Sequence, residues 1–197
     1  PDAPPSECPL ETWREKAREA GTRARDKLRD GVEAALLALG KGFLAHPDNT
    51  ALRQALAAGQ LSPEDYFNEL LRLVYRMIFL LTVEERGILH GGGVAPETRA
   101  LYDEGYSMRR LRERALRRSQ YDRHGDLWAS LQPVFTALGR AGGEPTLGLP
   151  ELGGLFATDQ CPHLDACTLE NRALLEAVFR LAWLREDSGL ARVNWKD

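Results

Sequence analysis

Hydrophobic positions are densest in the middle of the segment 62–86, where Arg72 and Arg76 are the only charged residues between Leu70 and Val83. Ser62 can accept hydrogen bonds from the first free amides of a helix, Pro63 fits the first helical position, and Glu64 and Asp65 complement the positive end of the helix dipole. We therefore predict one long, capped and almost wholly buried helix. Because a helix that is apolar all round must be covered, the rest of the chain is expected to pack around it.

Apolar residues recur at helical spacing in further segments on both sides of this helix. The expected helices cover residues 10–30, 32–45, 50–58, 96–102, 107–119, 125–138 and 168–183. The helix over 10–30 is strongly charged, and Gly21 is a point at which it can be interrupted. We find neither an internal repeat nor a heptad series. The predicted fold class is all-α, an irregular helical bundle around the long buried helix.

Residues 141–167 are rich in glycine and proline, which predicts an irregular loop segment. Loops of this length are uncommon in compact domains, so its leucines and Phe156 are expected to hold it against the bundle or against a missing neighbour. A small hairpin is compatible with the segment, although no pattern supports one. The predicted organisation is a flexible arm (1–9), a helical bundle (10–140), this loop segment (141–167) and a C-terminal helix within 168–197.

Composition narrows the class of protein. The 197 residues are 43% hydrophobic and 28% charged, enough to bury a real core. The formal net charge of −3 means that contact with nucleic acid requires a local basic patch.

Three cysteines are too few to form a disulfide framework for a chain this long. The longest apolar run near the central helix, residues 77–83, is far too short to span a membrane, and the N-terminus is too charged for a signal peptide. We expect a cytoplasmic protein with no membrane partner.

The strongest local charge pattern lies between residues 106 and 124. Five arginines there are the candidate contacts to DNA phosphates: Arg109, Arg110, Arg114, Arg117 and Arg118. On a helix, four of them line one face, and each phosphate that they neutralise adds affinity independent of base sequence. The alternatives are a solvated face, or ion pairs with the acidic neighbours Glu97, Asp103 and Glu104.

Cys161, His163 and Cys167 raise the question of a zinc site, because thiolate and imidazole are ligands that zinc prefers. A fourth ligand is missing, and the remaining cysteine, Cys8, lies in the N-terminal arm. A pair of loop thiols beside an incidental histidine is therefore the favoured interpretation, and no metal site is predicted.

Catalytic motifs are absent from the sequence. It has no phosphate-binding Gly-x-x-x-x-Gly-Lys loop and no Gly-x-Ser-x-Gly turn, and the carboxylates at the ends of the long helix (Asp65, Glu84 and Glu85) are expected to be solvated. No catalytic residue is predicted.

Arg72 and Arg76 lie one turn apart within the apolar helix, and a buried guanidinium needs a partner. They indicate either an internal salt bridge or a contact with another domain.

The ends of the chain favour a piece of a longer protein. Neither methionine comes first, and residues 191–197 resemble the start of a strand. The alternative is a trimmed tag with an ordinary C-terminus.

Several segments together resemble a known family. They are residues 28–35, 39–44, 70–81, 105–107, 111–112, 126–128, 149–156 and 192–195. In this order they are similar to the region that precedes the catalytic domain in large bacterial adenine-specific DNA methyltransferases, relatives of type IIG restriction-modification and phage-defence enzymes. The resemblance spans nearly the whole chain from Leu10 onward.

The resemblance implies a parent protein that transfers a methyl group from S-adenosylmethionine to adenine N6 in DNA. The Asn-Pro-Pro-Tyr motif and the cofactor loop of that family are both missing here, so no family site residue can be carried over and no cofactor is expected in this segment. What it implies is a helical accessory segment, non-catalytic alone, that supports the methyltransferase domain of the same parent chain and contacts the backbone of double-stranded DNA. The alternative is a structural protein-protein interaction module without direct DNA contact.

Overall fold

The computed structural model describes the backbone of residues 9–186 and 189–195, and the side chains of residues 26–184 and 189–195. The helices are α1 (Pro9–Ala45), α2 (Thr50–Ala57), α3 (Pro63–Arg86), α4 (Pro96–Gly105), α5 (Met108–Arg114), α6 (Asp126–Gly139), α7 (Pro162–Asp165) and α8 (Asn171–Ala182). Short 3-10 turns follow α5 (η2, Arg118–Gln120) and α6 (η3, Pro145–Leu147; η4, Gly154–Phe156). The strands β1 (Trp183–Glu186) and β2 (Gly189–Arg192) form one small hairpin. The predicted all-α class is confirmed.

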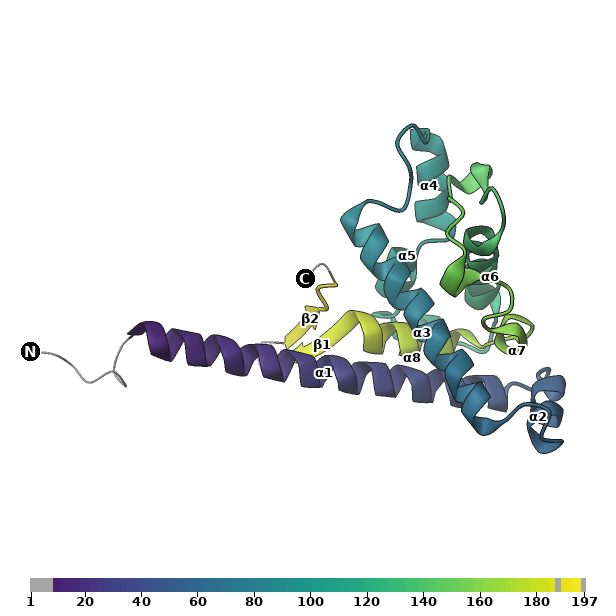
Figure 1. Ribbon diagram of the computed structural model, residues 1–197, viewed down its shortest axis with the longest axis horizontal. Helices are drawn as coiled ribbons and strands as arrows, with labels where there is room; N and C mark the ends of the chain where they lie inside the picture. The colour runs from purple at the N-terminus through teal and green to yellow at the C-terminus, as the bar shows by residue number, and fades with distance from the viewer. Residues whose placement is uncertain (1–8, 187–188, 196–197) are drawn as a thin grey trace, which may run out of the picture.

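The first helix is longer than predicted. Residues 10–30 and 32–45 were expected to form two helices, with a further interruption at Gly21, but α1 is continuous from Pro9 to Ala45. A single glycine costs only about 1 kcal/mol in a helix, which the neighbouring turns can offset. Figure 1 shows that the N-terminal part of α1 extends well beyond the rest of the fold. The proposed arm falls largely on residues 1–8, which lie outside the described residues.

The long helix begins and ends as predicted. The Ser62 hydroxyl accepts a hydrogen bond from the amide of Asp65 at 2.9 Å, and Gly87 ends α3 in the left-handed conformation that glycine adopts readily. The prediction that this helix is almost wholly buried is wrong, however. Its inner face is buried, whereas Phe67 and Tyr75 on the opposite face are 50% and 49% exposed. Figure 1 shows α3 crossing in front of α1 and α8.

One hydrophobic core joins the helices. Trp128 on α6 packs edge-on against Phe43 of α1, with 5.4 Å between the ring centres, and its indole nitrogen donates a hydrogen bond to the carbonyl of Cys167. Arg76 is fully buried inside this core. The core cluster contains residues from before, within and after the loop segment 141–167.

The loop segment 141–167 is irregular, as predicted, apart from α7 and the turns η3 and η4, and several of its anchors reach the core. Leu147, Leu149 and Phe156 are buried, while Leu152 is 44% exposed. No ladder forms here; the segment contains one isolated bridge between Glu144 and Leu149 among the residues described.

The C-terminal region departs from the prediction. The last helix was expected to run through Trp183, but α8 ends at Ala182 and the chain turns into the antiparallel hairpin. In its register Trp183 pairs with Arg192 and Leu184 with Ala191. The residues of β1 can pair only because β2 returns beside them, which the helical periodicity does not reveal.

Candidate nucleic-acid interface and adjoining groove

The arginine-rich segment starts at a strongly anchored helix end. The Ser107 hydroxyl accepts a hydrogen bond from the amide of Arg110, and the Glu84 carboxylate accepts bonds from the amides of Met108 and Arg109, each at 2.8 Å. The Tyr102 hydroxyl donates to the same carboxylate at 2.6 Å. Glu84 was expected to be solvated, which is wrong. It is only partly exposed because it occupies the positive end of α5, where free amides need an acceptor.

The predicted helix over 107–119 stops early. α5 ends at Arg114, and the Tyr121 hydroxyl donates to the carbonyl of Ala115 at 2.8 Å, so the chain turns back there. A helix of two turns cannot present arginines over 109–118 as one ridge, because their directions diverge after residue 114. The single cationic face expected from the sequence is therefore not formed.

Three of the five candidate arginines make contacts within the fold. Arg109 forms an ion pair with Asp103 at 2.5 Å, which raises the pKa of its guanidinium. Arg110 donates to the Ser130 hydroxyl at 2.7 Å and is half-buried, and burial lowers its pKa. Arg114 donates to the side-chain oxygen of Gln120 at 2.9 Å. The ion pair with Asp103 is one of those that the sequence offered as an alternative to DNA contact.

The other two candidates, Arg117 and Arg118, are exposed, and so is Arg123 a few residues later. We call these three residues the arginine turn. Within the part of the chain that the structure describes, none of their guanidinium groups has a hydrogen-bonded or ion-paired partner. Arg123 was not among the candidates, and its exposure follows from the turn after α5 rather than from helical spacing. The arginine turn is thus a local cationic surface on a chain whose net charge is negative.

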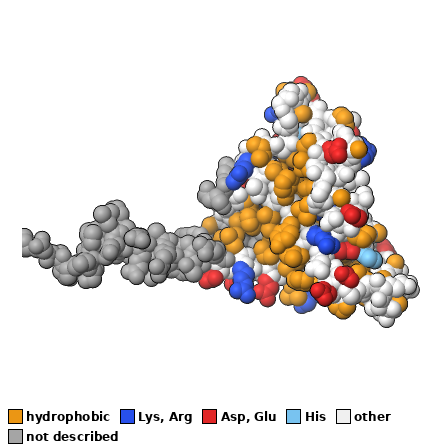
Figure 2. Space-filling model, in the orientation of Figure 1, with side chains coloured by type: hydrophobic (Ala, Val, Ile, Leu, Met, Phe, Trp, Pro, Cys, Tyr) orange, Lys and Arg blue, Asp and Glu red, His pale blue; other side chains and the backbone are white. Residues whose placement is uncertain are grey.

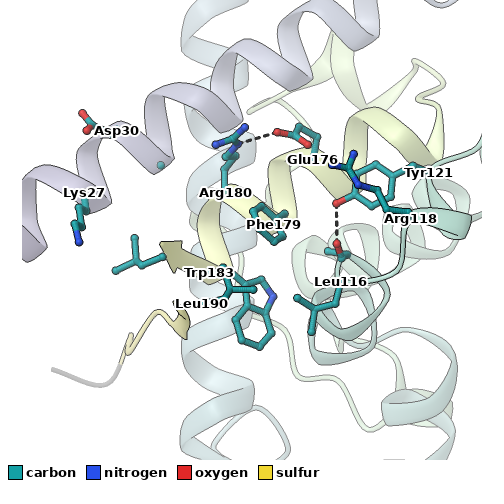
Figure 3. Close-up of a pocket in the computed structure, with 13 residues that line it drawn as sticks. Lys27, Asp30, Leu116, Arg118, Tyr121, Glu176, Phe179, Arg180, Trp183 and Leu190 are labelled. Atoms are coloured by element: carbon teal, nitrogen blue, oxygen red, sulfur yellow. Dashed lines mark hydrogen bonds and ion pairs between the residues drawn. The ribbon is translucent and has the colours of Figure 1, made fainter. Parts of the chain in front are cut away.

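A groove of about 540 Å³ lies beside the arginine turn, between α1, α8 and the hairpin. Figure 3 shows Phe179, Trp183, Leu116 and Leu190 around its middle. Two of these apolar side chains are largely open to solvent, Leu116 at 47% and Leu190 at 44%.

Charged side chains border the groove. Arg118 lies at its edge, near the ion pair between Arg180 and Glu176, whereas Lys27 and Asp30 come from α1 (Figure 3). The apolar middle and mixed charged rim are typical of a surface that binds a protein segment. The sequence pattern did not reveal the groove, because its walls come from four separate parts of the chain.

The candidate zinc residues have other roles in the fold. The Cys161 thiol donates to the carbonyl of Glu69, and burial raises the pKa of Cys161 to about 12 and that of Cys167 to about 11. Nδ1 of His163 lies 2.6 Å from the Glu69 carboxylate, which also accepts bonds from the amides that begin α7. Over the described residues, no three side chains of metal-binding type come together. Cys8, the remaining cysteine, lies outside them.

None of the described helices combines the length and apolar character that crossing a membrane requires. Comparison with known proteins finds no matching family model, no matching curated protein and no matching solved structure.

Proposed function

We propose that this chain is a helical accessory segment of an adenine-specific DNA methyltransferase or restriction-modification enzyme of the cytoplasm. In this role it supports the methyltransferase domain of the parent protein, which uses S-adenosylmethionine, and contacts the DNA backbone without catalysing a reaction itself. The ordered family resemblance supports the parent class. The arginine turn supports the DNA contact, and it is the observation on which that part of the proposal depends.

The expected contact is electrostatic and independent of base sequence. Arg117, Arg118 and Arg123 are exposed and can reach phosphates without breaking an internal ion pair. By contrast, Arg109 would have to leave Asp103, and Arg110 is held against Ser130. We therefore assign the larger part of the phosphate contact to Arg117 and Arg118, and a smaller part to Arg109, Arg110 and Arg114.

A salt titration tests the DNA contact. Binding of the chain to a labelled duplex is measured by fluorescence anisotropy at several salt concentrations, for the natural chain and for Arg117→Glu/Arg118→Glu. Each lost phosphate contact should reduce the slope of log affinity against log salt by about 0.9, so the double variant should lose about 1.8 and bind more weakly to every duplex. Lys41→Glu/Arg99→Glu, which makes the same charge change at two exposed positions elsewhere, should keep the natural slope. Equal slopes for all three proteins would reject the DNA contact.

The parent class is tested separately. Expression of the complete gene product should give methyl transfer from S-adenosylmethionine to adenine in DNA, measured as N6-methyladenine in digested product. Failure of this assay would reject the parent class, even if the isolated chain binds DNA.

A structural protein-protein interaction module is the second candidate. The groove favours it, since Leu116 and Leu190 expose apolar surface beside a charged rim, and so do the internal contacts of Arg109, Arg110 and Arg114. A module of this kind would not bind the duplex in the salt titration, even at the lowest salt concentration.

A further inference from the structure

One face of α3 carries no charge over about four consecutive helical turns. Phe67, Leu71, Tyr75, Ile78 and Thr82 follow each other at spacings of three or four residues, which places them on one side of the helix. We call these five residues the outer face of α3. Phe67 and Tyr75 are about half exposed, and Leu71 and Ile78 are partly exposed.

A solvent-facing helix surface is normally charged or polar, and a helix that is apolar all round is normally covered. The opposite side of α3 already supplies the core, through Leu73, Met77 and Leu80. Figure 2 shows hydrophobic side chains gathered over the middle of this view, in which Figure 1 places α3 in front of the other elements. A continuous apolar patch of this kind is typical of a protein-protein contact.

Two leucines of α1 extend the apolar surface. α1 and α3 meet at Gly40, whose carbonyl accepts a hydrogen bond from the Tyr66 hydroxyl at 2.8 Å. Leu37 and Leu44, three residues before and four after Gly40, are 57% and 37% exposed. These two leucines add exposed apolar surface on the side of α1 that carries Gly40.

We propose that the outer face of α3 binds a second copy of this chain, with the two α3 helices antiparallel about a twofold axis between Leu71 and Tyr75. A twofold contact requires that if one residue faces another, the reverse pair also forms. The outer face meets this condition. Antiparallel pairing puts Phe67 opposite Ile78 and Leu71 opposite Tyr75, so apolar side chains face each other over the middle of the contact, while Thr82 comes opposite Glu64 at each end.

Charge selects this orientation. Exposed acidic residues, Glu64 and Asp65, stand at the N-terminal end of α3, and exposed Arg86 stands in its last turn. Antiparallel packing brings Glu64 and Asp65 of one copy towards Arg86 of the other. It also places the positive end of one helix dipole beside the negative end of the other, which is favourable. Parallel packing would place like charges together at both ends. The proposal does not depend on the proposed function.

The size of the contact predicts a reversible dimer. The outer face of α3 spans residues 67–82 and is therefore about 24 Å long, so a strip about 10 Å wide covers about 240 Å² on each copy. With the two leucines of α1 the buried total stays at or below the roughly 1,200 Å² of the smallest stable interfaces. Association should therefore depend on protein concentration.

Sedimentation velocity tests the dimer from low to several hundred micromolar protein. The natural chain should shift from monomer to dimer across this range, whereas Leu71→Glu/Tyr75→Glu, which places four carboxylates at the axis, should remain monomeric. Ile88→Glu changes a residue that is 62% exposed just beyond the end of α3, and it should dimerise like the natural chain. A natural chain that stays monomeric, or a Leu71→Glu/Tyr75→Glu variant that still dimerises, overturns the proposal.

Disulfide cross-linking tests the orientation, in a Cys8→Ser background. A mixture of the Phe67→Cys and Ile78→Cys variants should form a disulfide-linked pair under mild oxidation. Neither variant should cross-link alone, because antiparallel packing separates each introduced cysteine from its own copy by about 11 residues, or about 16 Å. Cross-linking of Phe67→Cys with itself would indicate a parallel contact and contradict the proposed dimer.

Discussion

Two arginines one turn apart on α3 have different environments. Arg76 is fully buried and donates to the Asp165 carboxylate at 2.8 Å and to the carbonyls of Leu155 and Ala157. Its guanidinium also lies 5.3 Å from the ring centre of Phe135. Arg72 is only partly buried and donates to a single carbonyl, that of Gln160. Of the two interpretations that the sequence left open for this pair, Arg76 fits the internal salt bridge.

We predict that Arg76→Met lowers the free energy of unfolding by about 3 kcal/mol, because it leaves the Asp165 carboxylate partly buried without its partner. Burial already raises the pKa of Asp165. Urea denaturation followed by circular dichroism measures the change.

Arg72→Met is the matched control for this prediction. It removes one hydrogen bond to a carbonyl near the surface, so the loss should stay below about 1 kcal/mol. If the two variants were equally stable, Arg76 would not be the structural anchor inferred from its contacts.

At the scale of elements, α1 and α8 pack closely because glycines lie between them. A Cβ added at Gly31 would lie 2.5 Å from the carbonyl oxygen of Arg180, and one added at Gly42 would lie 2.5 Å from the Cβ of Ala173. Both are far shorter than any real carbon contact, so the two helices approach to a distance that only glycine permits.

Gly42→Ala should therefore destabilise the protein by about 1 to 2 kcal/mol, since the overlap with α8 outweighs the gain of up to about 1 kcal/mol in helix propensity. Thermal unfolding measures the difference.

Gly40→Ala lies half a turn away on α1 and provides the comparison. Its added Cβ would meet the flexible end of Leu70 at 3.1 Å, which can move aside. This variant should be neutral or stabilised by up to about 1 kcal/mol. A Gly42→Ala protein as stable as Gly40→Ala would contradict the close packing of α1 on α8.

At the scale of the molecule, the core is continuous although its polypeptide is irregular. Buried residues from α1, α3, α6, the loop segment and α8 belong to one cluster. Glu69 and Glu84 add polar links from α3 to the starts of α7 and α5, about 95 and 25 residues away in sequence. The shared core thus joins the bundle, the loop segment and the C-terminal helix that the sequence divided into separate parts.

Unfolding of the chain should consequently be one cooperative transition. In the variant Trp13→Phe/Trp183→Phe/Trp195→Phe, the fluorescence of Trp128 reports the core, and its midpoint in urea should coincide with that of far-ultraviolet circular dichroism. Separate midpoints would mean that the parts of the chain unfold independently.

Local features of this protein were predictable because they depend on neighbouring residues. Helical periodicity predicted the all-α class, and the hydroxyl of Ser62 with Pro63 defined the start of α3. Of the candidate interface, the sequence identified Arg117 and Arg118, which the structure leaves exposed.

Only the tertiary structure decided the contacts between residues far apart in the chain. Glu84 is a helix cap because α5 begins beside it, and Tyr121 ends the arginine helix by reaching back to Ala115. The apolar pattern predicted that the outer face of α3 would be buried, but such a pattern does not show whether another segment of the chain covers that face. Spacing along a helix specifies which side chains share a face, whereas the packing of distant segments determines what that face meets.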